Sequence, residues 1–246
     1  MLRLKIKGDL NKLIEKAMYK LINDKSVMDA KQTPRILSYD NILQADSTDF
    51  DYDLMKVGFT KVRWPRYLHQ YLDKEKLIDW LESLQYMSSK GDSLFRSKDM
   101  VRRKRDHKYG SCWTALSFRR NPPTLVLYSR VAEFPTRAVL ELTMAHKIAE
   151  EIRKVLEINE NVHFTWFISS LFLSCLHMVP YLAQRGELEE IKNRDDIVGK
   201  FIGHQLDHIA GGRVKYGPTK RMQKRLEQFK AGELKSVPIK DLSLWV

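Results

Sequence analysis

The feature that most constrains this fold is a long run without a charged side chain. Phe164 to Ala183 (FTWFISSLFLSCLHMVPYLA) has about the length that a helix needs to cross a bilayer. Three serines, a histidine and a proline interrupt it, and the flanking segments have the pattern of ordinary amphipathic structure. β-branched and aromatic residues crowd its first half. We expect a buried strand over 162–173 that runs into a buried helix over 176–184, with a membrane-associated protein as the alternative.

Hydrophobic periodicity predicts the other main elements. Apolar residues recur at helical spacing in three segments, and two strand-like runs flank a short turn rich in Asn and Pro. The predicted helices cover 9–24, 73–87 and 135–156, and the predicted strands cover 111–119 and 124–130. The turn predicts that these two strands form a hairpin, and 135–156 is expected to be a long core helix. The polar and acidic segment 31–53 favours a loop or linker.

Composition favours one folded α+β protein with a basic surface. The chain has 246 residues, 43% of them hydrophobic, and 43 Lys and Arg against 31 Asp and Glu give a net charge of +12. Such an excess attracts polyanions or phosphorylated ligands. Two cysteines cannot build a disulfide framework, and the first residues have no apolar signal, so a cytoplasmic protein is expected. The simplest division is a domain over 1–198 with a basic C-terminal extension over 199–246.

Two basic runs, around 102–108 and 220–225, are candidates for contact with a nucleic-acid backbone. The residues expected to make this contact are Arg105, Lys108, Lys220, Arg221, Lys224 and Arg225. Runs of this kind are more often solvated faces, and that alternative stays open. We therefore predict DNA or RNA as a possible partner.

Cys112 is the candidate nucleophile, because it lies at the start of a predicted strand and directly after a basic run. Nearby cations stabilise a thiolate and lower the pKa of a cysteine. The alternative is a buried structural cysteine, which fits Cys175 better. His204 and His208 share a helix face, but no third ligand stands at a suitable spacing, so no metal is expected. Glycine-rich phosphate loops and the hydrolase nucleophile elbow are missing from the sequence.

A succession of motifs resembles the central block of thymidylate synthases and the related pyrimidine hydroxymethylases. It comprises 112–118 (CWTALSF), 125–133 (LVLYSRVAE), the Phe-Pro pair that follows, and 145–149 (AHKIA), within a block of about 110–183. In that family a nucleophilic Cys begins a strand, a second strand carries a Tyr-x-Arg motif, and a helix follows. The resemblance implies a mixed β-sheet packed with a long core helix, and a homodimer whose sheets pack back to back.

The resemblance also implies roles for individual residues. Cys112 would add to C6 of a pyrimidine ring, Arg130 would bind the nucleotide phosphate beside the nucleophile, and Glu133 stands where the family has an Asp next to the base. These three are the implied catalytic residues. The residues assigned to the substrate are Ser129, Arg137 at the position of the base-reading Asn, and Arg102 and Arg103 as the phosphate-binding pair. We further expect Cys112 and Arg130 to lie on adjoining strands and to face one cavity.

The implied reaction transfers a methyl or hydroxymethyl unit from methylenetetrahydrofolate to C5 of a pyrimidine nucleotide, as in enzymes that build modified pyrimidines in bacteriophages. The chain departs from the family at several points. Gly110 and Ser111 replace a Pro-Pro pair, and the tryptophan-flanked Glu and the Arg-Thr-Gly phosphate loop are missing. A non-catalytic nucleic-acid-binding protein that retains the fold is therefore the alternative function.

Overall fold

The computed structural model describes residues 1–23, 28–29, 35–96, 112–210, 224, 227–228 and 231–246. Its helices are α1 (Leu10–Asn23), α2 (Trp64–Tyr71), α3 (Lys74–Ser83), α4 (Thr136–Leu156), α5 (Cys175–Arg185), α6 (Leu188–Lys192) and α7 (Ile197–Ala210). Its strands are β1 (Arg3–Ile6), β2 (Met28–Asp29), β3 (Arg35–Ala45), β4 (Asp92–Arg96), β5 (Trp113–Arg120), β6 (Pro123–Phe134) and β7 (His163–Ser174).

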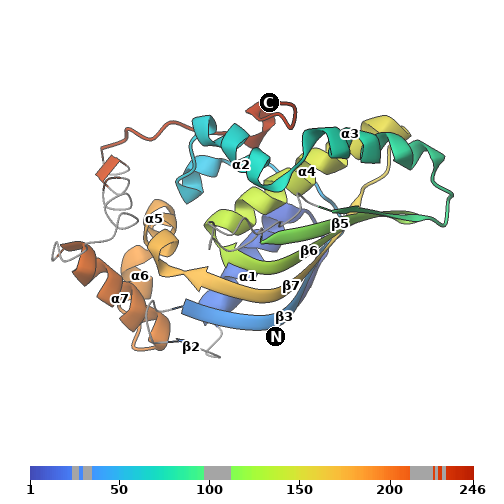
Figure 1. The fold of residues 1–246 in the computed structure, drawn as a ribbon. Helices are drawn as coiled ribbons and strands as arrows, with labels where there is room; N and C mark the ends of the chain where they lie inside the picture. The colour runs from blue at the N-terminus through green and yellow to red at the C-terminus, as the bar shows by residue number, and fades with distance from the viewer. Residues whose placement is uncertain (24–27, 30–34, 97–111, 211–223, 225–226, 229–230) are drawn as a thin grey trace, which may run out of the picture.

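The described strands form one mixed sheet of seven strands, in the order β1-β3-β7-β6-β5-β4 with β2 beside β3. The pairs β1–β3 and β6–β7 are parallel, and the other pairs are antiparallel. Helices gather along the sheet and at the end of β7 (Figure 1). The expectation of a mixed α+β fold is therefore confirmed.

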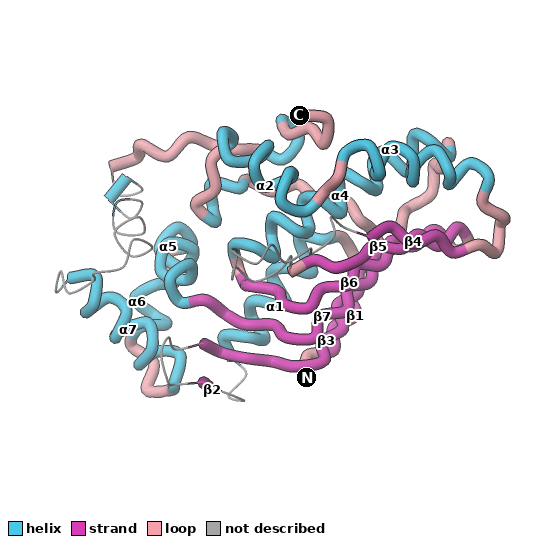
Figure 2. Tube along the Cα trace, viewed as in Figure 1, coloured by secondary structure: helices cyan, strands magenta, loops and turns pink. Residues whose placement is uncertain are grey.

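One face of the sheet carries the core. Leu43 of β3 pairs with Trp166 of β7, which pairs with Leu127 of β6, so these three buried side chains share a face. Helices α1 and α4 cover this face, which we call the helix face. The buried residues of both helices belong to the same core cluster as those of the strands. Alternate positions in the same strands point to the other face, which we call the open face, and two of them, Tyr128 and Phe167, are exposed. Figure 2 shows the helices and the sheet as separate layers.

The predicted hairpin and core helix are confirmed. β5 and β6 pair in antiparallel fashion from Trp113 to Arg120, and β6 leads directly into α4. The 21 residues of α4 include 13 buried ones, which is why this helix forms the centre of the core. The predicted helices over 9–24 and 73–87 correspond to α1 and α3, and the Asp9 and Asp73 carboxylates accept hydrogen bonds from backbone amides in their first turns.

The long uncharged run divides between a strand and a helix, as expected. β7 lies in the middle of the sheet between β3 and β6, and it continues directly into α5. Burial on the core side and central pairing account for the lack of charge in its first half. In the part of the chain that the structure describes, no helix combines the length and the apolar character needed to cross a bilayer.

The expectation of a loop over 31–53 was wrong, because this segment contains β3. This strand has 11 residues and pairs with both β1 and β7. The polar pair Asp40 and Asn41 in the middle of the strand interrupts the apolar pattern that predicts a strand. Asn41 is 1% exposed, and its amide donates to the carbonyl oxygens of Ser38 and Ile168, so the side chain completes the strand's hydrogen bonding.

Three neighbouring strands share an irregularity at the same level of the sheet. The regular pairings skip Asp40 of β3, Arg130 of β6 and Ser169 of β7, and Asp40 has a φ of 53°. We call these three the kink residues. On β7 the buried positions run through Trp166 and Ile168 and then shift to Leu171 and Leu173, so the strand turns its other set of side chains inward beyond the kink.

The last residues return to the core. The indole N–H of Trp64 in α2 donates to the carbonyl oxygen of Ser243 at 2.7 Å, and Val237 and Leu242 are buried. α5, α6 and α7 group together at the end of β7 (Figure 1). The domain boundary expected between residues 198 and 199 falls inside α7, and both parts contribute to one core cluster.

Candidate active site

Cys112 immediately precedes β5 and is held against β6. The backbone amide of Arg130 donates to the carbonyl oxygen of Cys112 at 2.8 Å. The pairing of the two strands is irregular between Trp113 and Ala115, directly after the cysteine. The side chain of Cys112 is half-buried. The backbone of Cys112 is therefore fixed to the sheet, while the residue keeps part of its surface accessible to solvent.

A guanidinium group from the first turn of α4 reaches this sulfur. Nη1 of Arg137 donates to Sγ of Cys112 at 3.7 Å, and its Nε lies 3.0 Å from Oε2 of Glu133. The Arg137 side chain is 52% exposed, whereas that of Glu133 is 11% exposed. Arg137 thus links a largely buried carboxylate on β6 to the cysteine and keeps part of its fork open to solvent.

A second carboxyl group, on α4, interacts electrostatically with the cysteine. Glu141, one turn after Arg137 on α4, is 1% exposed. Its Oε2 accepts from the Ser129 hydroxyl at 3.4 Å, and that hydroxyl accepts from the indole N–H of Trp166 at 2.8 Å. Among the described residues, Oε1 of Glu141 has no hydrogen-bond partner. Because an unpaired carboxylate oxygen is costly to bury, this environment favours the neutral form of the Glu141 carboxyl group.

Helix α2 closes the site with two tyrosines. Tyr67 and Tyr71 lie one helical turn apart with ring centroids at 4.8 Å, and Tyr71 stacks on Trp113 at 6.4 Å. Both tyrosines are buried. We call Tyr71, Cys112, Glu133, Arg137 and Glu141 the cysteine cluster.

Burial sets the protonation of the cluster. It raises the pKa of the Cys112 thiol, and the Glu141 carboxyl raises it further, while Arg137 and Arg130 oppose the shift. The expectation that nearby cations give this thiol a lowered pKa was wrong, because desolvation outweighs the guanidinium. Burial likewise raises the pKa of Glu141 to about 8, against the opposing effects of Arg137 and the Ser129 hydroxyl. Both groups therefore hold their protons at neutral pH.

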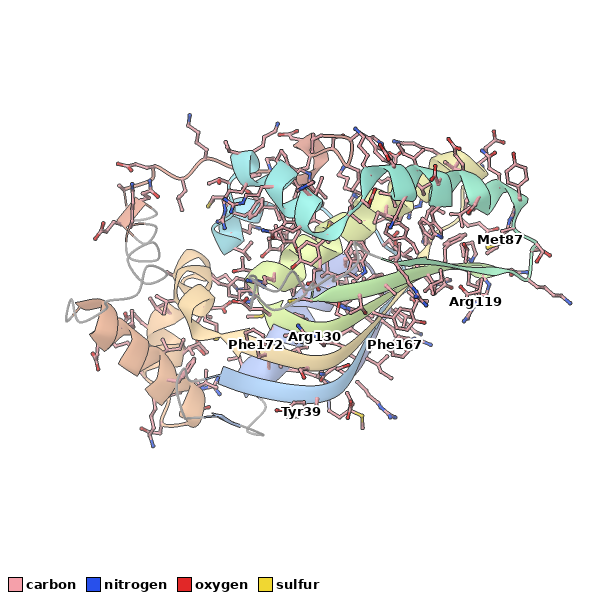
Figure 3. All side chains as sticks on the ribbon, viewed as in Figure 1. Tyr39, Met87, Arg119, Arg130, Phe167 and Phe172 are labelled. Atoms are coloured by element: carbon pink, nitrogen blue, oxygen red, sulfur yellow. The ribbon has the colours of Figure 1, made fainter. Side chains whose placement is uncertain are left out.

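Arg130 occupies a different place from the one expected. Its side chain is exposed, and it lines a hollow of about 580 Å³ on the open face with Tyr128 and Phe167. Cys112 is not among the residues that line this hollow. Figure 3 labels Tyr39, Arg130 and Phe167, which lie on β3, β6 and β7. The expectation that Cys112 and Arg130 face one cavity was wrong: the two lie on adjoining segments, but only Arg130 lines this hollow, and the guanidinium that contacts the sulfur belongs to Arg137.

The other predicted residues divide into those described and those outside the description. Ser129 is 4% exposed, so its hydroxyl supports Glu141 from within the core. Lys224 is exposed. The positions outside the described residues are Arg102, Arg103, Arg105, Lys108, Lys220, Arg221 and Arg225. The same holds for the side chains of His204 and His208.

Sequence reasoning missed Glu141 and the α2 tyrosines. A signal for Glu141 was present, since it lies on the same helical stripe as Ala145, Ile148 and Ile152, which are buried. A carboxylate on an apolar stripe points to a buried acid. Tyr67 and Tyr71 gave no such signal, because their approach to Cys112 depends on how α2 packs onto β5.

No protein-family model matches the chain, and no curated protein matches it as a relative.

Proposed function

We propose that this chain is a thymidylate-synthase-like transferase that adds a one-carbon unit to C5 of a pyrimidine nucleotide. The observation that carries the proposal is a half-buried cysteine whose sulfur has a guanidinium at 3.7 Å, with a buried carboxyl group, whose pKa burial raises to about 8, in the same cluster. A nucleophile, a cation and a proton-holding acid are the groups that covalent activation of a pyrimidine requires.

The chemistry begins when the thiolate of Cys112 adds to C6 of the ring. The C5–C6 double bond breaks, its electron pair moves through C5 onto O4, and the resulting enolate makes C5 nucleophilic. The chain's own residues carry the reaction to this activated C5, and the return path is protonation of C5, loss of the other C5 proton and elimination of the thiolate, which restores the double bond. Arg137 stands close enough to the sulfur to stabilise its charge.

Methylenetetrahydrofolate would supply the one-carbon unit, as the family resemblance implies. The aromatic rings around the cysteine, those of Tyr67, Tyr71 and Trp113, are all buried. Within the described residues the cluster therefore has no exposed ring on which a pterin could stack. The described side chains do not fit the folate, and the proposal covers only the activation of C5 by this chain's own residues.

The test needs no one-carbon donor. In D₂O, reversible addition of Cys112 to C6 lets deuterium enter C5 and lets the original proton leave. We expect the wild-type protein to exchange the C5 hydrogen of dUMP, of dCMP or of a pyrimidine in an oligonucleotide, which mass spectrometry of the nucleotide detects. Cys112→Ala should abolish the exchange, whereas Cys175→Ser should retain it. Failure of the wild-type protein to exchange any of these substrates would contradict the proposal.

The second candidate function is a non-catalytic nucleic-acid-binding protein. The raised pKa of Cys112 favours it, because the resting thiol is not activated. The net charge of +12 agrees with it as well. Binding of a labelled oligonucleotide that weakens steeply with salt, that Cys112→Ala leaves intact and that comes without C5 exchange would support this candidate over the enzyme.

We also propose that a second copy of the chain covers the open face. Tyr128 and Phe167 stack there with ring centroids 5.4 Å apart and are 37% and 39% exposed. Adjacent exposed aromatic rings on an uncovered sheet are typical of an interface. Light scattering should show a dimer for the wild-type protein and a monomer for Phe167→Lys. A monomeric wild-type protein would contradict the proposal.

A further inference from the structure

The strand register places six residues side by side on the open face, one from each of β1, β3, β7, β6, β5 and β4. In this order they are Arg3, Ile42, Phe167, Tyr128, Ala115 and Arg96, which we call the open-face row. With about 4.8 Å between neighbouring strands, the row is about 24 Å long. Both terminal arginines are exposed. A continuous path with two cationic ends therefore crosses the sheet.

Two aromatic rings form the centre of the open-face row. The rings of Tyr128 and Phe167 are stacked, with centroids 5.4 Å apart and an interplanar angle of 13°, and both are exposed. The hollow of about 580 Å³ lies along the row, since Arg3, Ile42 and both rings line it. Exposed rings of this kind are stacking partners for unpaired nucleobases, because every base has a π-face.

The exposed charges around the row are mainly positive. The exposed cationic side chains on this face, within the described strands, are Arg3, Lys5, Arg96, Arg119 and Arg130. Figure 3 labels two of them, Arg119 and Arg130, together with Phe167. The exposed acidic side chains on the described parts of these strands are Asp40 and Asp92. A second copy would bring the same cations against this face, whereas a polyanion neutralises them, so charge complementarity favours a nucleic-acid strand.

We propose that the open-face row binds a single-stranded nucleic acid, with bases stacked on the two aromatic rings and phosphates beside Arg3, Arg96 and Arg130. A duplex does not fit this arrangement, because its bases are already stacked on one another and it offers only its phosphates. The proposal goes beyond the C5 chemistry, since Cys112 does not line this hollow. The strand needs the face that the proposed second copy covers, so its binding should separate the dimer into monomers.

The first experiment measures the binding of a fluorescein-labelled oligothymidylate of about ten nucleotides by fluorescence anisotropy. Tyr128→Ala and Phe167→Ala should each weaken binding by about tenfold, because each removes a ring on which a base stacks. Tyr128→Phe keeps the ring and should bind as tightly as wild type. Tyr86→Ala, at a tyrosine outside the sheet that is 88% exposed, is the matched control and should have no effect.

The second experiment follows the same binding against salt concentration. Arg96→Gln should reduce the slope of log affinity against log salt by about 0.7, which corresponds to the loss of one phosphate contact. Arg66→Gln, at an exposed arginine of α2, should leave the slope unchanged. A DNA duplex of the same length should bind more weakly than the single strand, and the loss of either ring should not change its affinity.

The outcomes separate this proposal from the earlier ones. Binding of the oligothymidylate that is unchanged in both alanine variants would overturn it, while the second candidate function would stand with its contact elsewhere on the chain. A dimer that persists in light scattering with the strand bound would also overturn it. A wild-type protein that is monomeric without the strand would contradict only the proposed dimer. Exchange of the C5 hydrogen of dUMP tests the enzyme independently of this face.

Discussion

The two faces of the sheet differ sharply although the same strands build both. Ser129 and Trp166 point to the helix face, where they support Glu141, whereas the next residues in sequence, Arg130 and Phe167, are exposed on the open face. Strand alternation places a buried polar cluster and an aromatic, basic surface one residue apart. The ionisable groups on the helix face therefore have their pKa values shifted by desolvation, whereas the charges on the open face are screened by water.

The largest expected difference between the faces is in folding stability. Trp166→Ala removes a fully buried indole and its hydrogen bond to Ser129, and it should lower the free energy of unfolding by about 3–5 kcal/mol. Phe167→Ala, at the adjacent residue on β7, should cost about 1 kcal/mol or less in the monomer. Urea unfolding of both variants measures the difference, and equal losses would break the comparison.

The next effect is a pH dependence of stability that only the buried face should show. The folded-state pKa of Glu141, about 8, lies above the ordinary value of 4.5, so the folded protein keeps a proton that the unfolded chain releases. The stability that this bound proton contributes is complete below the ordinary glutamate pKa and is lost as the pH rises through about 8. Over that range the free energy of unfolding should fall by about 1.4 kcal/mol per pH unit.

Glu141→Gln removes this titration. The free energy of unfolding of the variant relative to wild type should therefore rise with pH across that window, as urea unfolding at several pH values would show. Glu151→Gln, at a partly exposed glutamate further along α4, is the control. A difference between Glu141→Gln and wild type that is constant with pH would mean that Glu141 is ionised in the folded protein.

The smallest expected effect compares the two arginines near Cys112. Arg137→Gln removes the guanidinium that contacts the sulfur, so the thiol pKa should rise and alkylation at neutral pH should slow by about threefold to tenfold. Arg130→Gln removes a cation that solvent screens on the open face, and it should slow alkylation by about twofold or less. If Arg130→Gln slowed alkylation more than Arg137→Gln, Cys112 would belong to the open face.

Much of the fold was predictable because its patterns are local. The hairpin of β5 and β6, the apolar stripe of α4 and the β-rich first half of the run at 164–183 each depend on neighbouring residues. β3 could not be recognised in the same way. Its polar residues at 40 and 41 are satisfied by partners far along the chain, as the 3.3 Å hydrogen bond from Asn41 to Ile168 illustrates.

The site was predictable only in part for a related reason. The order of motifs brought Cys112, Glu133 and Arg137 into consideration, and the structure brings these three together. The sequence could not assign the contact with sulfur to Arg137 rather than to Arg130. That choice depends on how the first turn of α4 docks against β5, and on which face of β6 each residue takes beside the kink.

The kink residues restrict which insertions and deletions this fold can accept during evolution. Asp40, Arg130 and Ser169 lie side by side, and beyond them Ala132 and Phe134 on β6 and Leu171 and Leu173 on β7 fill the interior. Deleting one residue at this level from a single strand would turn that strand's inner side chains toward water while its neighbours kept theirs. Insertions and deletions would thus have to occur together in all three strands, so these strands are free to diverge in side chains but not in length.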